Sequence, residues 1–165
     1  AHEFGLADRY EEELAACDAM VAELATRLPA GTAIVVTADH GQVHVGDQII
    51  DLPQSVTRLL DGQSGEARFR WLHARAGSAG DLVEAAHEAF DAVGWVRSVD
   101  EVVTAGWLGS EVTAVARARL GDVAVLARDP VAFVDPAEAM SFHLIGRHGS
   151  MTVDEMLVPA LAVVT

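Results

Sequence analysis

Apolar residues recur at helical spacing near the start of the chain. Between residues 6 and 28 they follow each other at steps of three or four and form one stripe, which consists of Leu6, Tyr10, Leu14, Cys17, Val21, Leu24 and Leu28. This pattern predicts an amphipathic helix with its apolar side, Cys17 included, against a core. Pro29 and Gly31 end the helix. The apolar run 33–37 that follows predicts a strand buried on both faces, as in a parallel sheet.

The pattern changes in the middle of the chain. Residues 41–65 contain scattered Gly and Pro and are expected to form loops. Residues 66–75 alternate, which predicts a half-exposed strand with Phe69, Trp71 and His73 on one face and Arg68 and Arg70 on the other.

A helix is predicted over residues 79–93, with Ser78 and Asp81 as its cap. Its inner face would consist of Leu82, Ala86, Ala89, Phe90 and Val93. A strand follows at 95–99, then a short helix capped by Ser98 and ended by Gly106, and a last strand at 121–128. Together these segments predict a small α+β lobe.

The whole pattern predicts an α/β protein: part of a doubly wound, mostly parallel sheet core, with a small α+β lobe inserted into it. The expected boundaries are residues 1–65 and 139–165 for the partial core and 66–138 for the lobe. Segment 156–164, which is apolar, is expected to form the last strand of the core.

The charge of the chain narrows the choice of partners. The 165 residues include 25 acidic and 11 basic residues, which give a net charge of −14. This balance argues against a nucleic-acid polymer as partner and suits metal cations. The one cysteine excludes an intrachain disulfide. No apolar run approaches the ~18 residues of a membrane span. We expect a cytoplasmic protein, although the start without Met suggests that a preceding segment, with or without a leader, exists.

Three histidines stand in positions that suit metal binding. Asp39 and His40 directly follow the strand at 33–37, and the carboxyl ends of such strands are where doubly wound folds bind ligands. Carboxylate oxygen and imidazole nitrogen are ligands for Zn²⁺. His148 lies between two glycines, and His2 precedes Gly5. The alternative is structural: Asp39 would cap a turn, and the histidines would be ordinary polar loop residues.

Two motifs, VVTADHG at 35–41 and GRHGSMTVDEMLVPAL at 146–161, carry a resemblance. They resemble the carboxyl half of the alkaline phosphatase superfamily, and within it the type I phosphodiesterase and nucleotide pyrophosphatase family. The resemblance implies that Asp39 and His40 bind one zinc ion and that His148 binds the other. The first residues, with His2 and Gly5, resemble a His-x-x-Gly element that binds the second ion. Residues 116–127 resemble a strand of the lobe that bacterial members insert.

The resemblance implies two divalent metal ions, zinc being the expected metal, at sites that this chain supplies only in half. The nucleophilic Thr or Ser of the family has no counterpart here, so the catalytic residue is expected upstream of the chain. The function implied is that of the carboxyl-terminal part of a two-metal phosphodiesterase or nucleotide pyrophosphatase-like hydrolase, inactive by itself. It would act on a small phosphoester or nucleotide and need the preceding amino-terminal segment as its partner.

The lobe would then shape the choice of substrate. Its arginines could contact phosphate, but most are expected to be surface charges; they are Arg68, Arg70, Arg75, Arg117 and Arg119. Two alternatives remain open. The chain could be a self-standing, non-catalytic domain that binds a metal or another ligand, or it could belong to a phosphatase or phosphomutase of the same superfamily.

Overall fold

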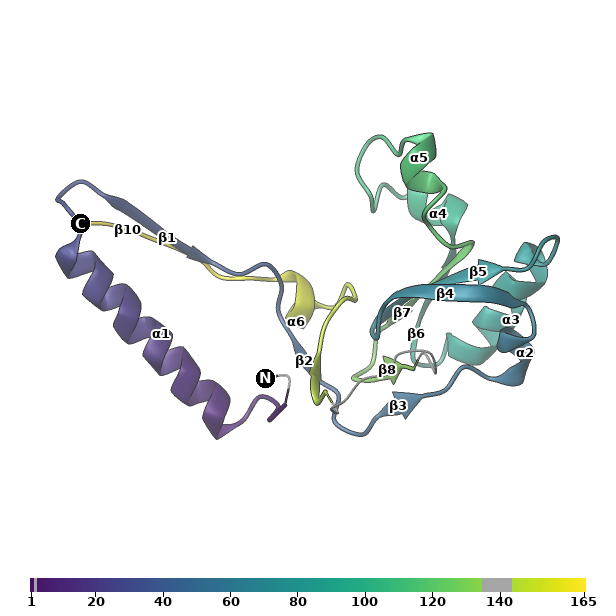
Figure 1. Cartoon of the computed structure of the whole chain (residues 1–165), viewed down its shortest axis with the longest axis horizontal. Helices are drawn as coiled ribbons and strands as arrows, with labels where there is room; N and C mark the ends of the chain where they lie inside the picture. The colour runs from purple at the N-terminus through teal and green to yellow at the C-terminus, as the bar shows by residue number, and fades with distance from the viewer. Residues whose placement is uncertain (2, 135–143) are drawn as a thin grey trace.

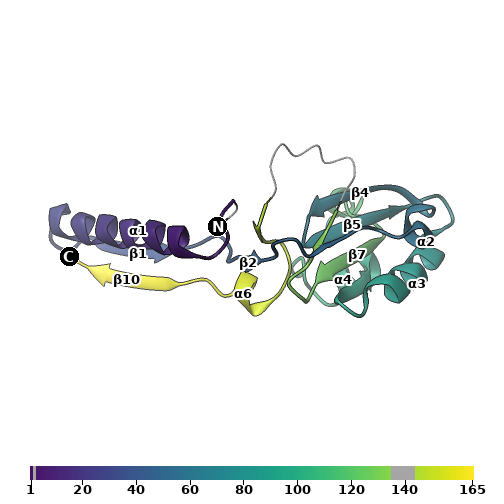
Figure 2. The same cartoon turned by 90° about the horizontal axis from the view of Figure 1, so that it is seen from below.

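The computed structural model describes residues 1, 3–134 and 144–165. The molecule is elongated (Figure 1). One end holds α1 (Asp8–Arg27) with the strand pair β1 (Ala33–Thr37) and β10 (Ala160–Val164). The other end holds a four-stranded sheet, and the short elements β2 (Val43–His44), β9 (Gly146–Arg147) and α6 (Val153–Met156) lie between the two ends. Figure 2 shows the same order of parts from below.

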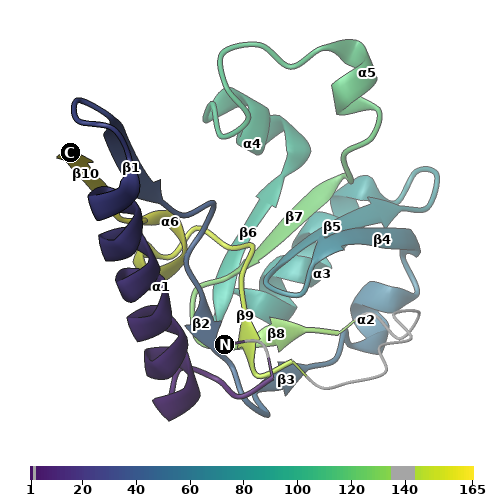
Figure 3. The same ribbon diagram turned by 60° about the vertical axis from the view of Figure 1, so that its left-hand side comes forward.

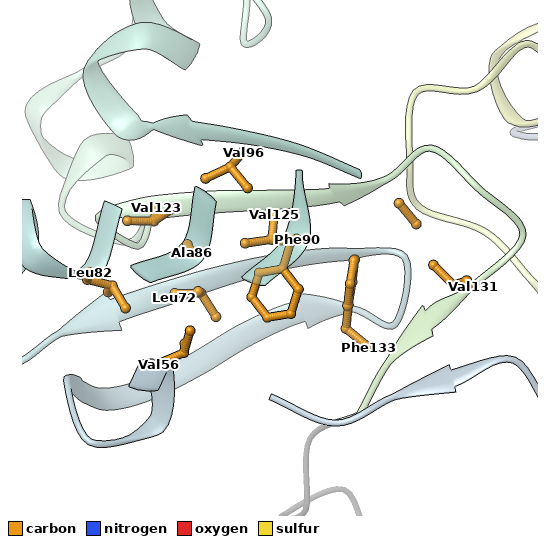
Figure 4. Packing of buried hydrophobic residues seen from close by; sticks show 11 residues of the cluster. Val56, Leu72, Leu82, Ala86, Phe90, Val96, Val123, Val125, Val131 and Phe133 are labelled. Atoms are coloured by element: carbon orange, nitrogen blue, oxygen red, sulfur yellow. The ribbon is translucent and has the colours of Figure 1, made fainter. Parts of the chain in front are cut away.

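The lobe is built on an antiparallel sheet with the strand order β4-β5-β7-β6. Its strands are β4 (Leu60–Glu66), β5 (Phe69–Ala74), β6 (Gly94–Ser98) and β7 (Val123–Ala127). Helix α3 (Ala79–Phe90) covers one face with the side chains that its periodicity predicts, since Leu82, Ala86 and Phe90 are buried. They pack in one cluster with Leu72 and with β7 side chains (Figure 4).

The opposite face of the lobe sheet is covered by α4 (Val99–Thr104) and by aromatic side chains. Val102 packs there on Ala124 and Leu126, with Trp95 and Trp107 beside them. The predicted cap of α4 is confirmed: the Ser98 hydroxyl accepts a hydrogen bond from the Glu101 N–H, and the Glu101 carboxylate accepts one from the Ser98 N–H. The lobe sheet is therefore covered on both faces by this chain. Two further short helices are α2 (Gln54–Thr57) and α5 (Ala114–Arg117).

Two expectations about the lobe are wrong. Residues 60–66 form a strand instead of a loop, because pairing with β5 overrides the low strand propensity of Asp, Gly, Gln and Ser. Arg68 and Arg70 are buried, at 0% and 1% exposure, and are not surface charges. The alternation predicted for residues 66–75 holds, but the arginine face is the more deeply buried of the two, and backbone carbonyls there accept the guanidinium hydrogen bonds.

The other end of the molecule has the expected elements without the expected burial. Strand β1 has the predicted bounds, but its described partner is β10, which runs antiparallel to it. Every residue of β10 is exposed, α1 has no buried residue, and Cys17 is exposed as well. The prediction of a buried strand and a buried thiol is therefore wrong for this chain, because its described residues place no layer over these side chains. The α/β class itself is confirmed.

Short pairings connect the two ends. Strands β2 and β9 pair antiparallel, while β3 (Ile49–Ile50) and β8 (Ala132–Phe133) form a parallel pair. Figure 3 shows these short strands between α1 and the lobe sheet. Among the described helices, none combines the length and the apolar character needed to cross a membrane.

Candidate metal centre

The pairing of β2 with β9 brings the two sequence motifs together. Val43 pairs with Arg147, so the residues just before β2 and just after β9 lie at the same end of the ladder. His40 and His148 meet there as stacked rings, with centroids 3.6 Å apart and planes at 13°. Two residues that are more than 100 positions apart in the sequence thus form one imidazole pair.

The His40 ring is held by its own backbone. Its Nδ1 lies 2.8 Å from the Gly41 carbonyl oxygen, which can only accept, so Nδ1 carries the proton and donates it. This leaves the Nε2 lone pair free for a ligand. Asp39 is mostly exposed; its Oδ1 accepts a 3.0 Å hydrogen bond from the His40 N–H, and its Oδ2 lies 3.7 Å from His40 Nε2.

Gly41, the residue after His40, lies in close contact with the backbone of α6. A Cβ atom at this position would lie 1.9 Å from the Asp154 carbonyl oxygen, so no other residue fits without moving α6. The Gly41 N–H donates a 2.9 Å hydrogen bond to the Glu155 carbonyl oxygen. The glycine after His40 therefore allows the histidine loop to lie directly on α6.

His2, the remaining predicted ligand, lies outside the described residues. Its neighbours form a turn in which the Gly5 N–H donates to the Ala1 carbonyl oxygen at 2.8 Å. A Cβ on Gly146 would lie 2.7 Å from that same oxygen, and a Cβ on Gly5 would lie 2.6 Å from the His44 ring. The turn at the start of the chain therefore lies against the β2–β9 pair.

Within residues 1, 3–134 and 144–165, no three His, Cys, Asp or Glu side chains come close enough together to hold a metal ion. The structure brings His40 and His148 together and leaves the Asp39 carboxylate in solvent beside them. Of the four predicted ligands, it thus describes three and pairs two.

Glu155 is a site residue that the sequence analysis missed. It is buried at 2% exposure and receives hydrogen bonds from the Ser150 N–H and the Thr152 hydroxyl. Burial by itself would raise the pKa of this carboxyl, but the hydrogen bonds from Arg68, Thr152 and Ser150 outweigh it, and the pKa is lowered. The signal was available, because Thr152-x-x-Glu155 has the spacing of a capping box at the start of α6.

A cavity of about 820 Å³ adjoins the His40 side of the centre. It is lined by the α1 region, by the loop from Ala38 to His44, by Pro130 of the lobe, and by the α6 region with Leu157. Its walls are mainly apolar, and its polar side chains include His40, Gln42, His44 and Asp154. The candidate centre therefore opens onto a large apolar space between the two ends of the molecule.

Fold and centre together define an α/β protein with two imidazoles paired at the end of a strand ladder. The chain belongs to the type I phosphodiesterase / nucleotide pyrophosphatase family, whose model matches residues 1–151. A comparison with curated proteins finds no match.

Solved structures of similar fold agree with this membership. Human ectonucleotide pyrophosphatase/phosphodiesterase 5 is 17% identical with a TM-score of 0.66, over 98% of this chain and 43% of that one. The murine protein in complex with AMP is 17% identical with a TM-score of 0.62, over 88% and 37%. Phosphonoacetate hydrolase from Sinorhizobium meliloti 1021 with phosphonoformate is 19% identical with a TM-score of 0.64, over 88% and 38%. The chain thus spans less than half the length of each of these structures.

Proposed function

We propose that the chain is the carboxyl-terminal part of the catalytic domain of a two-metal phosphodiesterase or nucleotide pyrophosphatase, and that it supplies half of each metal site. The stacked pair of His40 and His148, formed by the two motifs that resemble the family's metal-binding segments, is the observation that carries this proposal. Asp39 and His40 would hold one ion, and His148 and His2 the other.

The donor set fits the expected ions. A metal-binding histidine usually donates its other N–H to a carbonyl or carboxylate, and the His40 Nδ1–Gly41 contact has this form. Asp39 Oδ2 and His40 Nε2 are 3.7 Å apart, close enough for both to reach one ion at bonds of ~2.0–2.2 Å.

The second half-site is proposed from the described residues on either side of His2. Gly5 lies against the ring of His44, and the Ala1 carbonyl oxygen lies against Gly146. Both contacts are with the β2–β9 pair, which leads into His148.

The missing ligands and the nucleophile would come from a preceding segment. The surface that such a segment would cover is exposed here. Val35 and Leu161 lie on opposite faces of the β1–β10 pair and are 67% and 63% exposed, and Leu157, directly after α6, is 73% exposed. Monomeric proteins rarely leave large apolar surfaces of this kind open. A preceding amino-terminal segment that packs on β1, β10 and α6 would cover it and reach the histidine pair.

The substrate proposed is a small phosphoester or nucleotide. When bound, the two ions would lower the pKa of the attacking hydroxyl and stabilise the charge on the leaving oxygen. The residues of this chain orient the ligand nitrogens: Gly41 fixes the ring of His40, and the β2–β9 pairing sets His148 beside it. The lobe would cover the substrate, while Arg68 and Arg70 hold the lobe together instead of contacting phosphate.

A zinc titration by calorimetry tests the metal proposal. His40→Ala and His148→Ala are each expected to weaken zinc binding at least about 10-fold, since each removes one ligand. His87→Ala is the matched control, because His87 is an exposed lobe histidine paired with Asp91. Equal zinc affinity in all three variants would contradict the proposal.

A reconstitution experiment tests the half-enzyme part. The 165-residue chain alone is expected to leave a nitrophenyl phosphodiester intact, and the chain joined to the sequence that precedes it in its gene is expected to hydrolyse it. Tight stoichiometric zinc binding by the chain alone, without activity in the joined protein, would favour a self-standing binding domain. Activity on the monoester only would favour a phosphatase.

A further inference from the structure

A buried ion pair joins the lobe to the histidine loops. Arg68 lies at the turn between β4 and β5, and hairpin tips are usually in solvent, yet Arg68 is 0% exposed. Its Nε donates to Glu155 Oε1 at 2.7 Å, and its Nη2 donates to Glu155 Oε2 at 2.9 Å. Arg68 of the lobe thus donates one hydrogen bond to each carboxylate oxygen of Glu155, a residue of the segment that follows His148.

The remaining donors of Arg68 are also in use. Its Nη1 donates to the carbonyl oxygens of Asp129 and Val131 at 2.9 and 2.8 Å, and its Nη2 donates to that of Ala127 at 3.4 Å. A guanidinium has five N–H donors, and five hydrogen bonds are present. Arg68 is therefore fixed in one orientation and cannot serve as a phosphate ligand in this arrangement.

Glu155 contacts both histidine loops with different parts of the residue. Its Oε1 accepts a 2.9 Å hydrogen bond from the N–H of Ser150, two residues after His148. Its carbonyl oxygen accepts the 2.9 Å hydrogen bond from Gly41, the residue after His40. The Ser150 hydroxyl in turn donates to the Ala127 carbonyl at 2.6 Å, which Arg68 also binds.

We propose that Arg68 and Glu155 are positioning residues that hold the His40 and His148 rings in their stacked arrangement, so that the lobe sets the geometry of the metal centre. This inference rests on the proposed function for its metal readout. It assigns Arg68 and Glu155 no contact with substrate. It also gives the lobe a second role beside substrate choice, because its β4–β5 hairpin carries the residue that orders the centre.

The cost of burying charge favours this role over a purely stabilising one. Apolar replacements of a buried ion pair are often neutral or stabilising, because desolvation of the charges offsets their attraction. A pair that adds little net stability can still fix one orientation of the groups bonded to it, and here those groups are the backbones beside both histidines.

The decisive variant is Arg68→Met/Glu155→Leu, made in the full-length gene product that contains this chain. It removes both charges together and replaces them by apolar groups of similar volume, so no unpaired charge is left buried. Circular dichroism at the temperature of the titration checks that the variant is folded. Zinc affinity is expected to fall about 10- to 100-fold, the effect typical for loss of groups that orient metal ligands. The ¹³C-histidine NMR signals of His40 and His148, recorded without metal, are expected to lose the shifts caused by ring stacking.

Arg117→Met is the matched control. Arg117 also pairs with a carboxylate, that of Asp100, but both side chains are substantially exposed and far from the histidine loops in the sequence. It is expected to leave zinc affinity and both histidine signals unchanged.

Thr152→Val is a milder variant in case the double variant does not fold. It keeps the ion pair and removes one hydroxyl hydrogen bond to Glu155, and zinc affinity is expected to fall a few-fold. A folded variant of either kind with wild-type zinc affinity and wild-type histidine signals would overturn the inference. If wild-type protein binds no zinc, the proposed function fails, while the metal-free histidine signals still decide whether the pair positions the rings.

Discussion

The two ends of the molecule contain equally apolar elements but bury them to very different extents. In the lobe, β7 is buried at all five positions, with α3 on one side and α4 with its aromatic neighbours on the other. At the other end, β10 is just as apolar and is exposed at all five positions. The lobe sheet finds both of its covering layers within this chain, whereas residues 1, 3–134 and 144–165 supply neither layer to the β1–β10 pair.

This contrast shows what an apolar pattern predicts. It predicts that a face is built to be covered, and it does not say which part of a protein covers it. The lobe covers its own apolar faces, and it is therefore expected to contribute most of the free energy of unfolding of this chain. The β1–β10 pair and α1 are expected to gain most of their stability from contact with a further segment.

The largest expected effect follows from this difference. Phe90→Ala in the lobe core is expected to lower the free energy of unfolding by about 3–5 kcal/mol, because Phe90 is 1% exposed. Val35→Ala in β1 is expected to change it by less than about 0.5 kcal/mol, because Val35 is 67% exposed. Urea unfolding followed by circular dichroism measures both values.

The same two variants also test whether a preceding segment covers β1. In the chain joined to its preceding segment, the cost of Val35→Ala is expected to rise above about 1 kcal/mol, since the methyl groups would then be buried. If Val35→Ala leaves the free energy of unfolding unchanged in the longer protein as well, Val35 is exposed to solvent there too and the preceding segment does not cover it.

Acid is expected to weaken the lobe contact with the histidine loops. The pKa of Glu155 lies below its ordinary value of 4.5, because its hydrogen bonds with Arg68, Thr152 and Ser150 outweigh its burial. A lowered pKa contributes stability that is complete above pH 4.5 and is lost as the pH falls through the folded-state pKa. Wild type is therefore expected to lose stability below pH 4.5 more steeply than Glu155→Gln, measured by urea unfolding at several pH values.

Glu101 also has a lowered pKa, so it too contributes stability that is lost as the pH falls, and it needs its own control. The Ser98 N–H lowers its pKa as well, through the capping box of α4. Glu101→Gln is therefore measured beside Glu155→Gln. Parallel pH profiles of wild type and Glu155→Gln would show that the ion pair with Arg68 does not respond to acid.

How far the sequence predicts the fold depends on whether the signal is local. Strand β1 is predicted to the residue because four apolar residues and the β-branched Thr37 stand between Gly31-Thr32 and a polar loop. Strand β4, with the sequence LDGQSGE, has no such signal, and it forms because six of its residues pair with β5. The exposure of β10 was unpredictable for another reason, since burial depends on residues beyond the pattern itself.

In the candidate centre too, local features were predicted from the sequence and long-range contacts were not. The motifs identified His40 and His148, but their meeting depends on the two-residue pairs of β2 and β9, which no periodicity reveals. Arg68 was misplaced because alternation assigns a residue to a face and does not say that the face is covered. Its partner Glu155 carries a capping-box spacing that indicates a local hydrogen bond with Thr152, whereas the contact with Arg68 spans 87 positions.

Gly41→Ala has the next largest expected effect on stability. It changes a glycine of the candidate centre, and its control changes a glycine of the lobe. The added Cβ would lie 1.9 Å from Asp154 oxygen, so α6 must move. The expected cost is about 1–3 kcal/mol, with weaker zinc binding because the His40 loop shifts. Gly80→Ala is the control. Gly80 is an exposed residue of α3, and a Cβ there would have nothing within 4 Å. Alanine at this position is expected to raise the free energy of unfolding by about 0.5–1 kcal/mol. Equal effects of the two changes would contradict the close contact of Gly41 with α6.

The smallest effect tests the cap of α4 inside the lobe. Ser98→Ala removes the hydroxyl that accepts the Glu101 N–H and is expected to lower the free energy of unfolding by about 1 kcal/mol. Ser78→Ala is the matched variant, because Ser78 holds the same position before α3 but makes no hydrogen bond to the helix with its side chain, and a change near zero is expected. Differential scanning calorimetry resolves the two melting temperatures. Equal losses would mean that helix starts in the lobe are stabilised by burial rather than by capping, and the lobe would then owe its stability to its covered sheet alone.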